Sequence, residues 1–252
     1  MKVMYIDCSM GAAGDMLSAA LLELLSCNDR EVFIESFNAL GIPGVSMEAE
    51  PSVKCGVKGT HIRIKVNGEE EGHTHGHEGH HEHRGMAEIE HIINHLEGLS
   101  GEVRDNVMNV YKIIADAESK AHGVPVAEVH FHEVGAMDAI ADVTAVCMLM
   151  DRIGPDRVIA SRVNVGGGTV RSAHGILPVP APATAFILEG IPYYSGDIKS
   201  ELCTPTGAAL LKYFVSGYGD MPSMTIVSEG RGMGTKDFDV ANCVRITLGN
   251  AE

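Results

Sequence analysis

Residues 2–25 read KVMYIDCSMGAAGDMLSAALLELL. The apolar run from Lys2 to Ile6 predicts a buried β-strand, and a helix is predicted from about Asp15 to Leu25. The glycine-containing turn between them puts a helix N-terminus after a strand, a geometry that presents backbone N–H groups to an anion. The glycine spacing matches neither a dinucleotide-binding fingerprint nor a P-loop. Asp15 would repel a bare phosphate but could hold a metal ion that bridges to one; alternatively, the segment is only a tight turn with an acidic first helical turn.

The rest of the chain alternates helical and extended patterns. Helices are predicted over residues 30–40, 86–97, 102–122, about 133–150, 182–189 and 205–215, and extended segments over residues 46–54, 58–66, 157–165, 169–171, 224–229 and 242–248. Thr204 is the expected N-cap and Pro205 the first residue of its helix. Residues 173–182 are expected to form a proline-ordered loop. Residues 230–237 are expected to form a glycine-rich basic loop whose backbone could run along an anionic group. We therefore expect one α/β domain over residues 1–252, with a mixed β-sheet flanked by helices.

Composition excludes several classes of function. The formal net charge of −15 argues against nonspecific binding to nucleic acid or to an anionic membrane. The six cysteines are scattered, without a C-x-x-C pair, and are interpreted as reduced thiols. We find no signal sequence and no apolar run of membrane-spanning length. The sequence thus predicts a cytoplasmic protein without nucleic-acid or membrane partners.

Residues 128–142, EVHFHEVGAMDAIAD, are the expected centre of the chemistry. The alternation at the start of this stretch places Glu128, His130 and His132 on one side of an extended segment. From about Glu133 the pattern is helical and mainly apolar. Asp138 and Asp142 interrupt it four residues apart, and therefore lie on one helix face.

Imidazoles and carboxylates together suit a divalent ion of intermediate hardness, such as Ni, Mn, Fe or Zn. Carboxylates on a buried helix face also need a metal ion, an arginine or backbone donors to offset their desolvation. The predicted metal-binding residues of this stretch are His130, His132, Glu133, Asp138 and Asp142. The alternative is that the aspartates cap or pair with neighbours, and that the histidines belong to the core.

A second histidine-rich segment lies within residues 69–83, where histidine alternates with glycine and glutamate. Its six histidines are His73, His75, His77, His80, His81 and His83. Such a composition cannot bury a core, so we expect a mobile, solvated loop. We interpret the loop as a metal-binding one that loads or buffers the ion, because catalysis requires fixed geometry. The alternative is a tolerated low-complexity insertion.

Other titratable residues are weaker candidates. His174 lies in the proline-ordered loop and could be functional, since site residues concentrate in loops. By contrast, His91, His95 and His122 lie on predicted helices and are interpreted as surface or core residues rather than ligands.

Four motifs resemble those of one family. They are DCSxGxxGDM at residues 7–16, VHFHEVGAxD at 129–138, AHGxLPVPAPAT at 173–184 and TPTGAA at 204–209. Together with the histidine-rich segment they resemble the LarC family, the nickel-insertion proteins of the nickel-pincer-nucleotide pathway that supplies the lactate racemase cofactor. The resemblance runs from Met1 to about Gly249.

The resemblance implies a nickel-insertion lyase. Its expected reaction is insertion of Ni²⁺ into pyridinium-3,5-bisthiocarboxylic acid mononucleotide, with formation of sulfur–nickel and carbon–nickel bonds, and with dependence on CTP and on Mn²⁺ or Mg²⁺. Family members usually continue into a C-terminal domain that carries the CTP site. That domain is expected to be absent from residues 1–252, and a C-terminal LarC portion is the expected partner. Homo-oligomer formation stays open.

Within this framework, Asp7, Asp15 and His174 are the predicted catalytic residues. The two aspartates would support one cleft from the end of the first strand, and His174 would close it. Two alternatives stay open. One is a metallochaperone that stores or delivers Ni²⁺ through the histidine-rich loop, and the other is a divalent-metal hydrolase that uses the same carboxylates.

Overall fold

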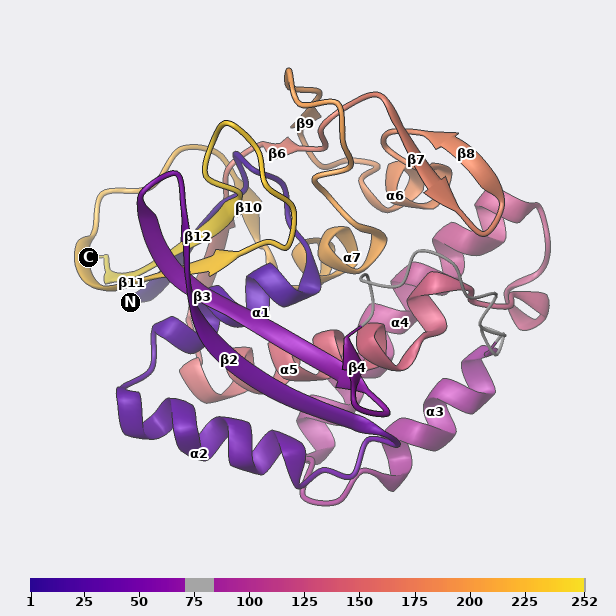
Figure 1. The fold of residues 1–252 in the computed structure, drawn as a ribbon, viewed down its shortest axis with the longest axis horizontal. Helices are drawn as coiled ribbons and strands as arrows, with labels where there is room; N and C mark the ends of the chain where they lie inside the picture. The colour runs from indigo at the N-terminus through magenta and orange to yellow at the C-terminus, as the bar shows by residue number, and fades with distance from the viewer. Residues whose placement is uncertain (71–83, 252) are drawn as a thin grey trace.

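The computed structural model describes residues 1–70 and 84–251 (Figure 1). Its main β-sheet has eight strands in the order β10-β5-β1-β12-β11-β3-β2, and β4 pairs with β3. The strands of this sheet are β1 Lys2–Asp7, β2 Val45–Lys54, β3 Val57–Val66, β4 Glu69–Glu70, β5 Arg157–Ala160, β10 Gly217–Tyr218, β11 Thr225–Met233 and β12 Cys243–Asn250. β1 pairs in parallel with β5 and antiparallel with β12. The predicted mixed sheet is therefore confirmed.

Two short pairs stand apart from the main sheet. β6 (Val163–Asn164) pairs in parallel with β9 (Tyr193–Tyr194), and β7 (Thr169–Ser172) forms a hairpin with β8 (Gly175–Pro178). The extended segment predicted over residues 157–165 is thus divided between two sheets. Likewise, the proline-ordered loop predicted over residues 173–182 contains a strand, because backbone pairing with residues 169–172 satisfies its polar groups.

Seven α-helices accompany the sheet in the described part of the chain. They are α1 Gly14–Glu23, α2 Cys27–Asn38, α3 Met86–His95, α4 Gly101–His122, α5 Met137–Ile153, α6 Pro182–Ile187 and α7 Pro205–Phe214. α1 contacts β11, β3 and α5, whereas α4 packs against α3, α5, α6 and α7. Alternation along β1 explains this layering, because Met4 and Ile6 join the main core whereas Val3 and Tyr5 join a small cluster with Ile159 on the other face.

The contact between α1 and β11 requires glycine. A Cβ atom on Gly232 would lie 1.8 Å from the carbonyl oxygen of Met16, and one on Gly230 would lie 2.0 Å from that of Ala20. Residues 230–233 belong to β11 rather than to a loop. The expectation of a glycine-rich loop around an anion is therefore wrong for these residues, whose glycines admit a helix backbone instead.

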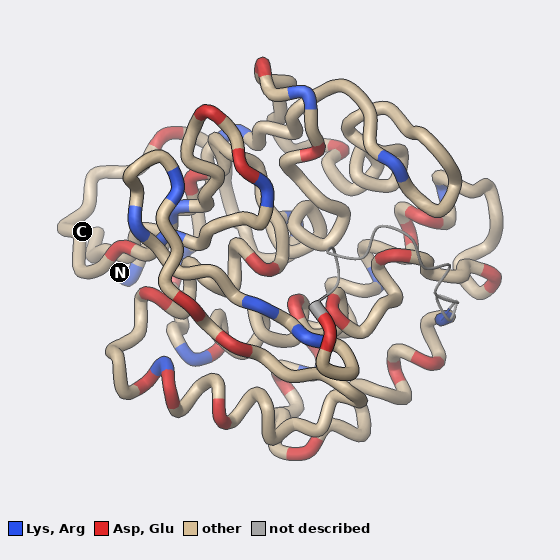
Figure 2. Tube along the Cα trace, in the orientation of Figure 1, with Lys and Arg blue, Asp and Glu red and all other residues tan. Residues whose placement is uncertain are grey.

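Charged residues are spread over the fold (Figure 2). On the β2–β3 hairpin, basic and acidic side chains pair across the strands, with Arg63 2.7 Å from Glu50 and Lys65 2.7 Å from Glu48. These exposed pairs stabilise the fold little. None of the helices in residues 1–70 and 84–251 has the length and apolar character that a membrane span requires.

Candidate functional site

Two cavities adjoin one another between α1, α4, α5 and the start of α7. The first, of about 290 Å³, is lined by Asp15, His61, Asp138 and Asp142, and we call it the carboxylate cavity. The second, of about 270 Å³, is lined by Glu118, His122, His132 and His174, and we call it the imidazole cavity. Four residues line both: Glu133, Val134, Glu201 and Pro205. The cavities therefore share a wall.

The carboxylate cavity depends on a close approach of α5 to the start of α1. A Cβ atom on Gly14 would lie 2.6 Å from Cβ of Asp142 and 2.7 Å from its Oδ2. Glycine at this position lets the Asp142 carboxylate reach the first turn of α1, where it accepts a hydrogen bond from the backbone N–H of Asp15. Asp138 lies one turn earlier on the same face of α5 and in its first turn. The prediction that Asp138 and Asp142 share a face is confirmed.

Burial makes these carboxylates reluctant to ionise. Burial is the main cause that raises the pKa of Asp142 well above its usual value, and the charges of Asp15 and Asp138 add to it. Burial also raises the pKa of Asp15, although hydrogen bonds from the backbone and the nearby His61 oppose the rise. Oδ1 of Asp142 is buried and accepts no hydrogen bond from the described residues. A bound cation would relieve this desolvation.

His61 supplies an imidazole to the same cavity. It lies on β3, is only 9% exposed, and its Nδ1 lies 2.9 Å from the carbonyl oxygen of Met233. That contact fixes the ring plane and favours the tautomer with the proton on Nδ1. A histidine held in this way adds an imidazole to the acidic lining of the cavity.

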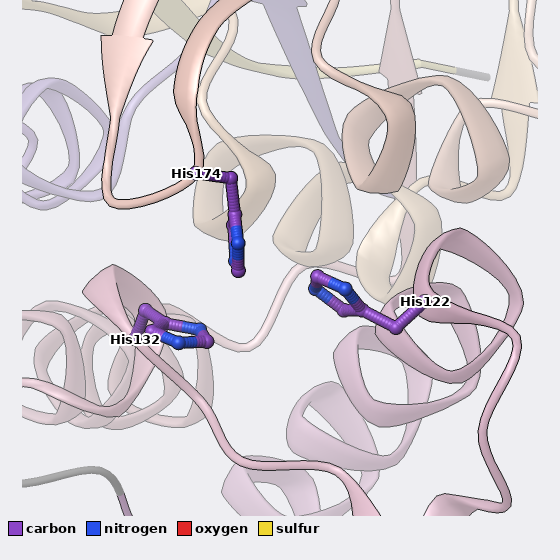
Figure 3. Close-up of side chains that lie close together, drawn as sticks. All are labelled: His122, His132 and His174. Atoms are coloured by element: carbon purple, nitrogen blue, oxygen red, sulfur yellow. The ribbon is translucent and has the colours of Figure 1, made fainter.

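The imidazole cavity gathers three histidines from separate segments (Figure 3). His122 is the last residue of α4, His132 precedes the short 3₁₀-helix η2 (Glu133–Gly135), and His174 lies in the turn between β7 and β8. One ring nitrogen from each lies within 4.8 Å of the others. Ring centroids are 4.4 Å apart for His132 and His174, and 4.6 Å apart for His122 and His174. Within residues 1–70 and 84–251, these three histidines form the group of potential metal ligands whose donor atoms lie within 4.8 Å of one another.

Glu118 supports this group from one helical turn before His122. Its Oε2 lies 3.3 Å from Nε2 of His122. Burial raises the pKa of Glu118, while His122 and His174 lower it and Glu133 raises it. A half-buried carboxylate next to an imidazole orients the ring and increases the basicity of its other nitrogen.

The shared wall is acidic. Burial raises the pKa of Glu201 to about 7, with Lys236 opposing the rise and Glu133 adding to it. Glu133 is exposed and begins η2, directly after His132. The wall between the two cavities can therefore change its charge near neutral pH.

The structure divides the metal-binding set predicted from residues 128–142. His132 lines the imidazole cavity, Asp138 and Asp142 line the carboxylate cavity, and Glu133 lines both. His130 is exposed and lines neither of the two. The extended segment predicted here is wrong: its backbone makes a single bridge, from Phe131 to residue 84, after the 3₁₀-helix η1 (Val126–Glu128). The alternation of residues 128–132 nevertheless matches their burial, with Val129 and Phe131 buried and Glu128 and His130 exposed.

The predicted catalytic residues separate as well. Asp15 lies in the carboxylate cavity and His174 in the imidazole cavity. Asp7 lines neither of them and instead pairs with Arg245 at 2.9 Å. The structure therefore does not bring Asp7 to the cavity of Asp15. The histidines of residues 73–83 lie outside the described residues.

Sequence reasoning missed two histidines of the site, His61 and His122, and two glutamates, Glu118 and Glu201. His122 is exposed, as the sequence predicts, but its side chain lies against His132 and His174. A signal was present in the spacing Glu118–His122, which puts a carboxylate and an imidazole on one helix face. His61 lies in a strand with no local pattern to mark it, and only the approach of β11 to β3 places it beside Asp15.

Comparison with known proteins gives a consistent assignment. The model of a family described as nickel insertion protein matches residues 4–252. A protein of Clostridium kluyveri named pyridinium-3,5-bisthiocarboxylic acid mononucleotide nickel insertion protein is 42% identical over 257 residues, which cover 100% of this chain and 63% of the relative. The protein of the same name from Geobacillus kaustophilus is 39% identical over 250 residues, or 99% of this chain and 60% of the relative.

A putative nickel insertion protein of Citrifermentans bemidjiense is 38% identical over 252 residues, with 100% of this chain and 62% of the relative covered. The chain thus spans about three fifths of the length of these relatives. No solved structure matches it. On the extent of the family match and of these identities, the chain belongs to the nickel insertion protein family.

Proposed function

We propose that this chain is the metal-handling part of a protein that inserts Ni²⁺ into pyridinium-3,5-bisthiocarboxylic acid mononucleotide. The observation that carries the proposal is the shared wall of Glu133 and Glu201, which places an imidazole donor set beside a carboxylate-lined cavity. Imidazole is a suitable ligand for Ni²⁺. The names of the relatives supply the identity of the acceptor.

The proposed substrate fits the chemistry of this cavity pair. Its name specifies two thiocarboxylic acid groups on a pyridinium ring. Thiocarboxylate sulfur is a soft donor and competes with imidazole for nickel. Cavities of about 290 and 270 Å³ approach the size of small-molecule sites. A substrate seated across the shared wall would bring its sulfur atoms to the histidines.

Asp15, Asp138 and Asp142 keep a role as the acidic part of the site in this proposal. Among the described residues, their oxygens do not form a set of three as close as the imidazole nitrogens. A hard cation such as Mg²⁺ or Mn²⁺ keeps several water ligands. It could therefore bind here through one or two carboxylates and water, and offset the raised pKa of Asp142.

The dependence on CTP follows from the family resemblance. We propose that the complete reaction uses CTP with Mn²⁺ or Mg²⁺, with the nucleotide bound by a C-terminal LarC portion outside residues 1–252. Calorimetric titration of this chain with CTP and Mn²⁺ should then show no tight binding. Micromolar binding would show that the nucleotide site lies within these residues.

The reaction itself can be tested by reconstitution. This chain, mixed with its C-terminal counterpart, Ni²⁺, CTP and the mononucleotide, should produce the nickel-containing product, detected by mass spectrometry. Asp142→Asn should lower the yield at least tenfold, whereas the exposed α4 variant Asp116→Asn should leave it unchanged. An equal yield from Asp142→Asn would remove the carboxylate cavity from the proposal.

A metallochaperone is the second candidate, and the imidazole cavity favours it too, because a converging histidine set can deliver nickel without insertion. The reconstitution separates the two functions. A metallochaperone would supply Ni²⁺ to another protein while giving no nickel-containing mononucleotide in the mixture of this chain with its C-terminal counterpart.

A further inference from the structure

The convergence of His122, His132 and His174 needs an explanation beyond local structure. The three lie on a helix end, before a 3₁₀-helix and in a hairpin turn, and up to 52 positions separate them in the sequence. Figure 3 shows the three rings facing one space. Positively charged rings this close would repel one another, whereas neutral imidazoles are metal ligands. The arrangement is favourable when the rings are neutral and share an ion.

The spacing is close to that of a bound transition metal. Imidazole nitrogens lie roughly 2.1 Å from such an ion, so neighbouring donor atoms lie roughly 3–3.5 Å apart. The nitrogens of this set are within 4.8 Å of one another. Rotation of exposed side chains closes the difference, since His122 and His174 are exposed and lie at the ends of their elements.

Two features favour a cation at this position. His122 ends α4, and the C-terminus of a helix carries partial negative charge. Glu118 also lies 3.3 Å from Nε2 of His122. A carboxylate that accepts a hydrogen bond from one imidazole nitrogen makes the other nitrogen a better ligand.

We propose that Ni²⁺ is held by His122, His132 and His174 before it is transferred, with Glu118 as the positioning residue for His122. Three protein ligands leave coordination positions open, as in metal sites that exchange ligands. A sulfur donor of the substrate can bind there before the imidazoles dissociate. The choice of nickel rests on the proposed function; the binding site itself rests on the geometry.

The test must separate this site from the histidine-rich segment. We would therefore replace the six histidines of residues 73–83 by glutamine in the full chain and titrate it with NiCl₂ by calorimetry. One Ni²⁺ per chain should bind. His122→Ala, His132→Ala and His174→Ala should each lower the affinity at least 100-fold. His91→Ala and His95→Ala, which alter an exposed histidine pair on α3, should leave the affinity unchanged.

The role of Glu118 has its own control. Glu118→Gln should lower the affinity about tenfold, within the range for loss of a partner of a metal ligand, whereas Asp116→Asn on the same helix should have no effect. X-ray absorption of the nickel-loaded protein should show about three imidazoles, and a signal of about two in His132→Ala. Unchanged stoichiometry and affinity in the three histidine variants would overturn the site.

Failure of the site and failure of the proposed function give different results. If Ni²⁺ binds as described but the reconstituted mixture makes no product, the site stands and nickel insertion by this chain fails. If product forms at the normal rate while the three histidine variants bind and react like the parent protein, the insertion stands and this site is wrong.

Discussion

The two cavities differ in how firmly their residues are held. In the carboxylate cavity, Asp15 and Asp142 lie on helices whose backbones touch neighbouring elements, and Gly14 and Gly232 permit those contacts. In the imidazole cavity, the histidines lie at the ends of elements, and two of the three are exposed. The first cavity is thus a firmly held acidic pocket, and the second is a set of ligands able to adjust.

This difference suits a site that takes up and releases an ion. Ligand exchange requires side chains that can move, whereas recognition of a charged partner benefits from fixed charges that need no reorganisation. The shared wall of Glu133 and Glu201 connects both kinds of chemistry. Four experiments can break or sharpen this contrast, from the largest expected effect to the smallest.

Gly232→Ala should disrupt the packing of α1 against β11, which holds Asp15 in the carboxylate cavity. The alanine Cβ would lie 1.8 Å from the carbonyl oxygen of Met16, so α1 must move away from β11. We expect a loss of about 3 kcal/mol in the free energy of unfolding, the upper part of the usual range for overpacking. Urea denaturation measures it. Gly219→Ala is the control, because a Cβ at Gly219 meets nothing within 4 Å; equal stability of both variants would show that the contact is not rigid.

The stabilisation of the folded protein by added nickel should depend on the imidazole cavity and not on the carboxylate cavity. A ligand at one hundred times its dissociation constant stabilises the folded state by about 2.7 kcal/mol. In the protein without histidines in residues 73–83, this gain should be lost in His132→Ala and retained in Asp142→Asn. Thermal unfolding with and without NiCl₂ measures it. Loss of the gain in Asp142→Asn but not in His132→Ala would reverse the assignment of nickel to the imidazoles.

The shared wall should make stability depend on pH. The pKa of Glu201 is about 7 in the folded protein, above its usual value of 4.5. Between these values the folded state keeps a proton that the unfolded state has lost, so stability falls as pH rises through this window. Glu201→Gln should therefore match the wild type below pH 4.5 and be more stable by about 2 kcal/mol above pH 7. The exposed Glu128→Gln variant should show no such difference, and parallel curves for Glu201→Gln would contradict the buried environment of Glu201.

Asp142→Asn should have the smallest effect on the free energy of unfolding. The substitution should stabilise the metal-free protein, whereas most substitutions in a core destabilise it. The pKa of Asp142 is raised in the folded state, so its ionisation destabilises the metal-free fold above the pKa of the unfolded chain, near 3.8. Removing the charge should stabilise the metal-free protein at pH 7 by about 1 kcal/mol, within the range for desolvation of one buried polar group. The gain should vanish below pH 4. Marked destabilisation at pH 7 would show that Asp142 is a structural residue.

Local patterns predicted the elements better than the site. The two paired strands of residues 45–66 match the predicted extended segments. The N-cap of α7 follows from Thr204, whose side chain accepts a hydrogen bond from the N–H of Gly207. The face shared by Asp138 and Asp142 follows from helical spacing. These features depend on residues a few positions apart, which is the range over which a sequence pattern carries information.

The rest depends on contacts between distant residues. Val129 and Phe131 are buried as their alternation indicates, but no strand forms because the segment has one bridging partner rather than a ladder. The grouping of His122 with His132 and His174 requires the packing of α4 against α6 and the return of the β7–β8 hairpin. Until the three segments are brought together by the fold, the sequence shows only three separate histidines and no metal site.

The glycine contact between α1 and β11 also has a consequence for the time at which the site is assembled. Met16 touches Gly232, more than two hundred positions later in the chain. Contacts between residues so far apart in the sequence form slowly. During synthesis, the N-terminal part of a polypeptide is made first. The helix that carries Asp15 is therefore synthesised early but reaches its final place only after β11 has been made. During synthesis the face of α1 that packs against β11 therefore stays uncovered until β11 has been made, even where α1 already contacts β3 and α5.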